Sequence, residues 1–288
     1  MSLMRSISGI RGIVGESLTP EVVVNYAAAF AEYCRGKKIV IGRDGRITGK
    51  IIGNLVSSTL LAKGCDVIAL GISATPTIQI AVEELGAAGG ISLTASHNPI
   101  EWNGLKFIGQ SGMFLNADEN KRLWEIAENT NRNYTTWDKI GKHTSDDSFA
   151  QKHIDIVSKL PFINVTDVRK RKFRVVVDCI NAAGGVIVPQ LLKQLGCDVI
   201  EMNCDVSGVF SRAPEPIPEN LGAVCDRVVN EKADLGIVVD PDVLPRCARA
   251  ADWRHERPPT STGRSTARPN LAELQGFTHR GRRHRLAR

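Results

Sequence analysis

The stretch KIVIGRDGRITGKIIGNLVSSTLLAKGCDVIAL, residues 38–70, contains the pattern that indicates the fold class. It opens with an apolar run over residues 38–42 that is typical of a buried strand. A helical pattern follows over about residues 51–63 and ends at Gly64. A second apolar run, residues 65–70, predicts the next strand. Strands that alternate with helices in this way imply a parallel sheet covered by helices on both faces.

The same alternation continues on both sides of this stretch. Residues 19–21, Thr-Pro-Glu, combine an N-cap hydroxyl, a proline at the first helical position and an early acid, so we expect a helix from there to Gly36. Residues 75–76, Thr-Pro, are expected to cap a third helix. The apolar run at residues 89–94 then predicts a further buried strand.

A short repeat suggests that this plan occurs twice. Residues 64–68 and 196–200 both read GCDVI, and each copy follows a leucine-bearing helix. The second copy precedes a helix over about residues 219–232 and a strand at residues 235–239. We therefore predict two α/β domains of similar plan, joined by a polar linker near residues 129–148. Convergence remains an alternative, because helix, C-cap glycine and buried strand form a common unit.

Length and composition limit the class of protein. A chain of 288 residues favours one or two domains. No apolar run reaches the roughly 18 residues that a membrane span needs, and the N-terminus lacks a signal-peptide pattern. The cysteines show no C-x-x-C spacing, which argues against a zinc site or a disulfide framework and for a reduced, cytoplasmic compartment. The seven are Cys34, Cys65, Cys179, Cys197, Cys204, Cys225 and Cys247.

The positive charge is confined to one end of the chain. Residues 244–288 hold eleven arginines, no lysine and three acids, a net charge of +8. Subtracting this from the whole-chain value of +6 leaves −2 for residues 1–243. We therefore expect no specific nucleic-acid partner for the regular part of the chain. A basic arm that binds RNA or other polyanions is an alternative for the end segment, although its only aromatic residues are Trp253 and Phe277.

Residues 94–99, TASHNP, follow the strand at residues 89–94. Ligands of α/β proteins bind at the carboxyl ends of strands, so Ser96 lies where a ligand is expected. The hydrolase signature G-x-S-x-G is absent. His97 would point away from Ser96 in extended backbone and is poorly placed to act as its base. The alternative is a plain turn, which Ser, Asn and Pro form in any fold.

Residues 240–242, Asp-Pro-Asp, end the strand at residues 235–239. Two carboxylates beside a buried strand are unfavourable unless they are paired or bind a cation. Such oxygen ligands suit Mg²⁺, which favours phosphate as a further ligand. An Asp-Pro turn at a strand end is the alternative.

Four motifs stand in one order: SGIRG at residues 8–12, GRDGR at 42–46, TASHNP at 94–99 with NGLK at 103–106, and DPD at 240–242. The ordered set closely resembles the α-D-phosphohexomutases, the family of phosphoglucomutase, phosphomannomutase and phosphoglucosamine mutase. The resemblance covers residues 1 to about 243 and favours the bacterial phosphoglucosamine mutase or phosphomannomutase branch.

The resemblance implies an α/β fold of two similar three-layer α/β/α domains with mainly parallel mixed sheets, followed by an irregular basic tail. Domain I would span residues 1–145 and domain II residues 146–243. The implied activity is intramolecular phosphotransfer between the 6- and 1-positions of a hexose or hexosamine phosphate, through a bisphosphorylated sugar.

The resemblance also assigns roles to individual residues. Ser96 would be the phosphoserine that carries the phosphoryl group. Mg²⁺ would be held by Ser96, Asp240 and Asp242. Arg11 and Lys106 would lie beside the transferring group, where a cation stabilises charge or exchanges a proton. The supporting residues of the phosphoserine loop would be His97, Asn98, Asn103 and Arg43, the last of these by bidentate bonding.

The sequence departs from the family's Asp-x-Asp-x-Asp-Arg metal pattern at Leu244 and Pro245. Loss of one carboxylate should weaken cation binding. Composition also changes abruptly here, since all fourteen lysines precede residue 244. We hypothesise a frame shift at about Val243, which would make residues 244–288 a disordered tail and leave the chain inactive or nearly so. A non-catalytic sugar-phosphate-binding or regulatory fragment is the alternative.

Overall fold

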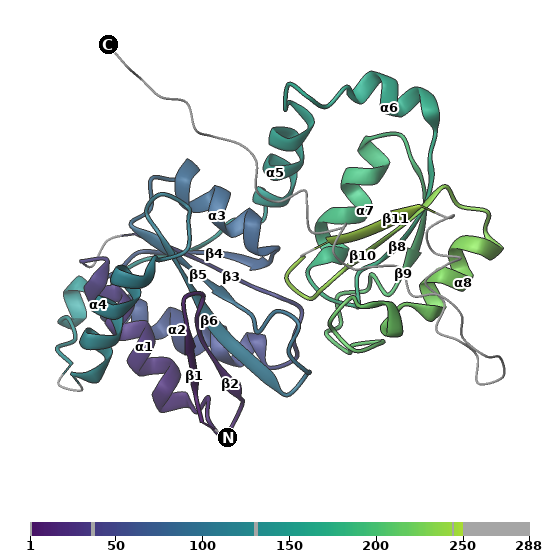
Figure 1. The fold of residues 1–288 in the computed structure, drawn as a ribbon. Coiled ribbons are helices and arrows are strands. Elements are labelled where there is room, and N and C mark those ends of the chain that lie inside the picture. The colour runs from purple at the N-terminus through teal and green to yellow at the C-terminus, as the bar shows by residue number, and fades with distance from the viewer. Residues whose placement is uncertain (1, 36–37, 130–131, 244, 250–288) are drawn as a thin grey trace, which may run out of the picture. The chain divides into compact units, whose positions relative to one another are not determined.

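The computed structural model describes residues 2–35, 38–129, 132–243 and 245–249 (Figure 1). The hypothesised tail, apart from residues 245–249, lies outside the described residues. These residues form two sheets, each covered by helices on both faces, as the sequence predicts. Among the described residues no helix is long and apolar enough to cross a membrane.

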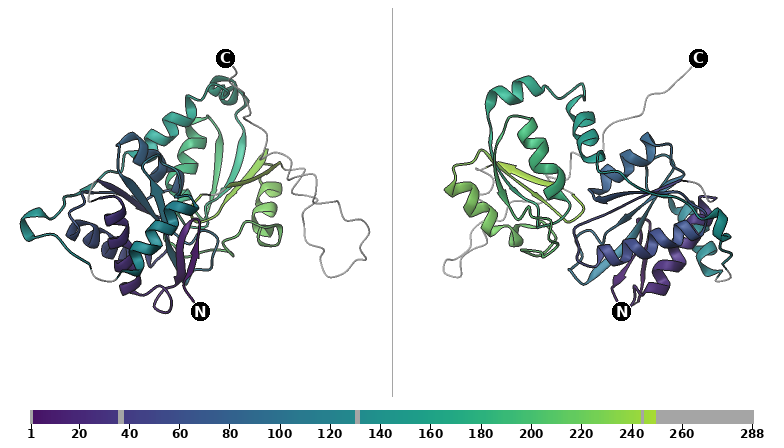
Figure 2. Two further views of the ribbon diagram at one scale, coloured as in Figure 1. Left: turned by 60° about the vertical axis from the view of Figure 1, so that its left-hand side comes forward. Right: turned by 180° about the vertical axis from the view of Figure 1, so that it is seen from behind.

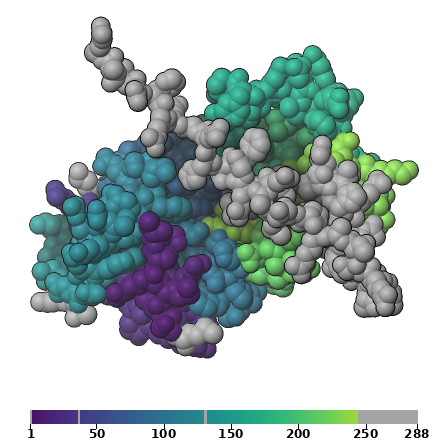
Figure 3. All heavy atoms as spheres, in the orientation of Figure 1, coloured from purple at the N-terminus to yellow at the C-terminus, as the bar shows by residue number. Residues whose placement is uncertain are grey.

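The first sheet is mixed and has seven strands in the order β1-β2-β6-β5-β3-β4-β7. Parallel pairing joins β5 to β3, β3 to β4 and β4 to β7, whereas β1, β2 and β6 run antiparallel to their neighbours. The strands are β1 (Met4–Ser6), β2 (Gly9–Ile13), β3 (Ile39–Arg43), β4 (Val67–Ile72), β5 (Gly89–Leu93), β6 (Trp102–Gly109) and β7 (His143–Ser145). Two of the three β1 residues are exposed on this edge, and Figure 3 shows the N-terminal residues in purple at the surface.

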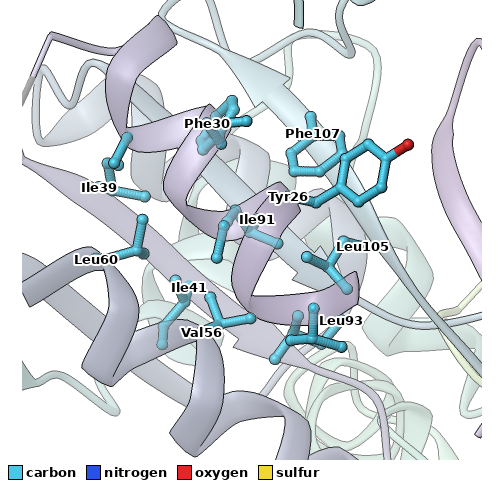
Figure 4. Close-up of a cluster of buried hydrophobic side chains, with 14 of the residues drawn as sticks. Tyr26, Phe30, Ile39, Ile41, Val56, Leu60, Ile91, Leu93, Leu105 and Phe107 are labelled. Atoms are coloured by element: carbon cyan, nitrogen blue, oxygen red, sulfur yellow. The ribbon is translucent and has the colours of Figure 1, made fainter. Parts of the chain in front are cut away.

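One face of this sheet is covered by α1 (Pro20–Tyr33), α2 (Gly49–Ala62) and α4 (Ala117–Glu128). Seen from behind in Figure 2, α1 and α2 lie side by side on that face. Figure 4 shows the core beneath them, where Phe30 packs on Phe107 with 5.0 Å between ring centres. The opposite face carries α3 (Thr75–Glu84) and the first residue of α5 (Phe149–Ser158).

The second sheet has four strands in the order β11-β10-β8-β9. Its parallel strands are β8 (Arg174–Asp178), β9 (Asp198–Met202) and β10 (Leu235–Val239). Helix α7 (Gly184–Gln194) packs with α5 on one face, and α8 (Gly222–Asn230) covers the other. The remaining elements are α6 (Val165–Arg171) and the 3-10 turns Trp137–Lys139 and Pro218–Asn220.

The two GCDVI copies occupy equivalent places. Gly64 and Gly196 both have positive φ, 81° and 78°, which ends the preceding helix without the steric conflict that a side chain would bring. In each case the following strand, β4 or β9, pairs in parallel with the strand that precedes the helix. The repeat in the sequence therefore marks the same strand, helix and strand unit in both sheets.

Three expectations were wrong. The residues predicted as an irregular tail begin with strand β11 (Pro245–Arg249), which pairs antiparallel with β10. An open sheet edge offers main-chain hydrogen bonds to any extended segment, whatever its side-chain pattern. The predicted linker includes β7, which adds to the edge of the first sheet. Thr75 does not cap α3 but is its first residue, and its hydroxyl is used elsewhere.

Candidate active site

Ser96 follows β5, at the carboxyl end of the strand. Its backbone has φ 51°, a left-handed conformation that non-glycine residues adopt only where the surroundings hold it. The Ser96 amide donates to Thr94 Oγ1 at 2.9 Å, and the Asn98 amide donates to the carbonyl of Ala95 at 3.0 Å. These hydrogen bonds form a tight turn directly after β5, and Ser96 lies in this turn and not in the strand.

The turn is held from beneath by a buried ion pair. Asp44 and Arg46 have fully buried side chains, and Arg46 Nε donates to Asp44 Oδ2 at 3.0 Å. The same carboxylate oxygen accepts from the Thr94 hydroxyl at 2.7 Å. The rest of the Arg46 guanidinium donates to four backbone carbonyls around the turn, those of Ser96, Asn98, Pro99 and Trp102. Arg46 thus satisfies carbonyls that the left-handed turn removes from the sheet.

This brace is a role that the sequence had assigned to a neighbouring residue. Arg43 donates one hydrogen bond, from Nη1 to the carbonyl of Asp44 at 3.1 Å, and does not grip the turn. It lines a separate cavity instead. Both arginines belong to the GRDGR motif, and only the register at the end of β3 decides which one points beneath Ser96.

Asp240, which follows strand β10 of the second sheet, is the hydrogen-bond partner of the Ser96 hydroxyl. The Ser96 Oγ donates to Asp240 Oδ2 at 2.8 Å, and Asp240 is fully buried. His97 is exposed, so the partner of the serine hydroxyl is this carboxylate and not the adjacent imidazole. The two motifs, 144 positions apart in the chain, therefore meet, as the family resemblance implies.

Lys106 lies against the other carboxylate of the DPD motif. Its Nζ is 2.6 Å from Asp242 Oδ2, which also accepts from the Thr75 hydroxyl at 2.9 Å. Lys106 faces this side of the sheet because it pairs across the strands with Ser92, whose hydroxyl bonds to Thr75. Burial alone would raise the pKa of Asp242, but the attraction of Lys106 and hydrogen bonds from Lys106, Thr75 and Ser96 hold that pKa below its ordinary value.

Arg11 and Asn98 form the third part of the site. Arg11 Nη1 donates to Asn98 Oδ1 at 2.8 Å. Its Nε is buried without a hydrogen-bond partner among the described residues, which leaves one N–H that an anion could accept. A small cavity beside it is lined by Ser8, Arg11 and Lys106 among others. Gly104, opposite Arg11 in the sheet, leaves the room that the arginine side chain occupies.

Asn103 supports the site from behind. It is fully buried, its amide donates to Thr48 Oγ1 at 3.0 Å, and its Oδ1 accepts from the Gly104 amide at 2.8 Å. The structure thus gathers Ser96, Asn98, Arg11, Lys106 and both aspartates, and it places Asn103 behind them. Arg46 and Thr94 lie within the GRDGR and TASHNP motifs, but neither was predicted as a site residue, and Thr75 was predicted only as a helix cap.

The donor set suits a hard cation. Two buried carboxylates beside a hydroxyl that could carry phosphate are the oxygen ligands that Mg²⁺ uses in phosphoryl-transfer sites. Within the described residues no group of three or more His, Cys, Asp or Glu side chains is placed to hold a metal. A cation here would therefore depend on Asp240, Asp242 and the Ser96 oxygen together.

Comparison with known proteins shows the family to which the chain belongs. Residues 4–134 match the family domain described as "Phosphoglucomutase/phosphomannomutase, alpha/beta/alpha domain I", and residues 151–244 match domain II of the same family. The chain belongs to the phosphoglucomutase/phosphomannomutase family. Ser96, Arg11 and Lys106 fall within the first matched range, and both aspartates fall within the second.

Curated members of the family show the same relationship. The chain is 37% identical over 236 residues to the "Probable phosphoglucosamine mutase" of Methanopyrus kandleri, which covers 82% of this chain and 51% of that protein. It is 36% identical over 240 residues to the "Phosphoglucomutase/phosphomannomutase" of Thermococcus kodakarensis, with 81% and 52% covered. The chain thus spans about half the length of the curated relatives it matches.

A solved structure of a family member from Burkholderia thailandensis superposes with a TM-score of 0.69 at 27% sequence identity, over 83% of this chain and 54% of that one. The phosphoglucomutase of Paramecium has the same fold, with a TM-score of 0.68 at 20% identity and coverage of 84% and 52%. The family's domain I and domain II folds are therefore both present in this chain.

Proposed function

We propose that this chain carries the phosphoserine half of a phosphohexomutase site. Ser96 would accept a phosphoryl group from a hexose or hexosamine bisphosphate and return one to a hexose monophosphate. The observation that carries the proposal is the hydrogen bond from Ser96 Oγ to the buried Asp240 carboxylate, with the Lys106–Asp242 pair in the same polar cluster. The names of the relatives, phosphoglucosamine mutase and phosphoglucomutase/phosphomannomutase, support a sugar phosphate as the substrate class.

The arrangement suits phosphoryl transfer because that reaction depends on positioning and on neutralisation of charge. The Ser96 proton is directed at Asp240, which leaves the oxygen lone pairs for attack on phosphorus. A bond from Oγ to phosphorus would form, the bond from phosphorus to the sugar oxygen would break, and Lys106 would give that oxygen a proton. Asp240 would take the proton of the serine hydroxyl.

Arg11 would hold the transferring group through its free Nε–H, and Asn98 would orient Arg11. His97, exposed on the turn, would contact the sugar phosphate from outside. Asp240, Asp242 and the Ser96 oxygen would hold Mg²⁺, which supplies neutralisation of the phosphoryl charge when bound. Because residue 244 is leucine where the family pattern has a third carboxylate, we propose weak Mg²⁺ binding and slow turnover.

Labelling tests the proposal directly. The purified chain is incubated with glucose 1,6-bisphosphate labelled in its phosphates and Mg²⁺, and phosphoserine is located by peptide mass spectrometry. We expect label on Ser96 in the wild type and none in Ser96→Ala. Asn129→Ala, outside the motifs, is the control and should be labelled like the wild type. Label on another residue, or equal label in Ser96→Ala, would refute the assignment.

The cation assignment has its own test. Calorimetric titration of the phosphorylated chain with Mg²⁺ should give weak binding that strengthens at least about tenfold in Leu244→Asp, which restores the third carboxylate. Binding should be lost in Asp240→Asn. If Leu244→Asp binds no tighter, residue 244 does not limit the affinity.

A further inference from the structure

A second cavity lies in domain I, apart from the Ser96 site. Neither Ser96 nor its partner Asp240 lines this cavity. It has a volume of about 130 Å³ and is formed where β3 and β4 end beside the first turns of α2. A cavity of roughly 150 Å³ accommodates a benzene-sized molecule, so a small ligand fits. Its polar lining consists of Arg43, Lys50, Asn54, Ser57 and His143.

All five polar side chains can donate hydrogen bonds, and no carboxylate lines the cavity. Lys50, Asn54 and His143 are exposed at the rim, whereas Arg43 and Ser57 are partly buried. Arg43 and Lys50 are basic side chains, and His143 is a further hydrogen-bond donor. The lining is therefore built for a ligand with several acceptor oxygens and negative charge.

Arg43 gives the cavity its strongest anion-binding group. Its guanidinium makes one hydrogen bond, from Nη1 to the backbone carbonyl of Asp44, and no carboxylate lies within ion-pair distance among the described residues. The Asp44 carboxylate is already taken by Arg46 and Thr94. Burial lowers the pKa of Arg43 through the lost hydration of its charge, and the attraction of the Asp44 carboxylate opposes this only in part. A bound anion would replace that hydration with charge-assisted hydrogen bonds.

We propose that this cavity is a binding site for a phosphate group, free or as part of a small phosphate ester, separate from the Ser96 site. Phosphate offers up to four acceptor oxygens to the Arg43 fork, Lys50 and the hydroxyl and amide donors of α2. The ligand would contact β3 one residue before Asp44, the residue whose carboxylate holds the brace beneath Ser96.

Amide NMR titration tests the site without relying on activity. Inorganic phosphate is added to the full chain at constant ionic strength, and the backbone shifts of Gly42, Gly53 and Ala69 are followed. We expect saturable shifts at these amides in both the wild type and Ser96→Ala. The same titration with glucose 6-phosphate shows whether an ester is also accepted. Since Ser96→Ala removes the phosphoryl acceptor, failure of the proposed function would leave this result unchanged.

Variants of the cavity distinguish phosphate binding at a specific site from nonspecific attraction to the positive charge of the chain. Affinity should fall at least about tenfold in Arg43→Gln, and several-fold in Lys50→Gln, because each removes a charged donor. Lys121→Gln, an exposed lysine on α4, is the matched control and should bind phosphate as the wild type does. Lys50 is exposed, so its variant keeps the test informative even if Arg43→Gln fails to fold. Shifts confined to the Ser96 turn, or an equal loss in Lys121→Gln, would overturn the proposal.

Discussion

Replacement of Arg46 by methionine should destabilise domain I severely. The side chain is fully buried, and its removal leaves the buried Asp44 carboxylate without its cation. Breaking a buried pair in this way costs about 3–5 kcal/mol. Four backbone carbonyls also lose a donor, although water can reach the partly exposed Ser96 and Asn98. We therefore expect a loss of at least about 3 kcal/mol in the free energy of unfolding.

Urea unfolding followed by tryptophan fluorescence measures this loss. Trp102 is largely buried, and Trp124 packs edge-on against Tyr26 with 5.5 Å between ring centres, so the fluorescence of these two side chains reports on domain I. A double-mutant cycle with Asp44→Asn isolates the pair, because the double variant no longer buries an unpaired charge. We expect the double variant to lose at least about 1 kcal/mol less than the sum of the single losses.

Arg43→Gln is the matched control from the same motif. Arg43 is only partly buried and makes one hydrogen bond, so its loss should stay near 1 kcal/mol. The reasoning would be refuted if Arg46→Met and Arg43→Gln destabilised the chain equally, or if the two single losses at Asp44 and Arg46 simply added.

Three further outcomes follow from the site and the sheet. Because its pKa is lowered in the folded chain, Asp242 contributes stability that is present above its ordinary pKa near 3.9 and is lost as the pH falls through the lowered value. Unfolding free energy should accordingly fall less between about pH 5 and pH 2 in Asp242→Asn than in the wild type, and an identical pH dependence would contradict this. Gly104→Ala should destabilise by about 1–3 kcal/mol in urea unfolding, because the new Cβ would clash with the backbone carbonyl oxygen of Ile10. Gly222→Ala, whose Cβ meets nothing within 4 Å, is its control and should be neutral or slightly stabilising. Lys106→Met should slow phosphoryl transfer to Ser96 at least about tenfold in a labelling time course, whereas a wild-type rate would remove Lys106 from the reaction.

Much of the fold could be predicted because strong local patterns and strand pairing agree. The strand at residues 235–239 was predicted with the bounds that β10 has, and Thr19 caps α1 by accepting from the Val22 amide, as its position before Pro20 indicates. Strand β7 was missed because it is short and fully exposed, with no alternation to detect. Strand β11 was missed because residues 245–249 show no strand pattern in the sequence, and their pairing with β10 is a contact that only the fold reveals.

Residue patterns alone were enough to predict the alternation of strands and helices, the repeated unit and the strand-end positions of Ser96, Asp240 and Asp242. These follow from local periodicity, glycine conformation and the rule that parallel strands end at one edge. The folded arrangement was needed to show that Arg46 rather than Arg43 braces the turn, that the Thr75 hydroxyl bonds to Asp242 and does not cap a helix, and that Lys106 pairs with that aspartate. These contacts depend on the direction in which a side chain points from its strand and on which distant segment lies opposite it. Neither property can be read from the spacing of residues along the chain.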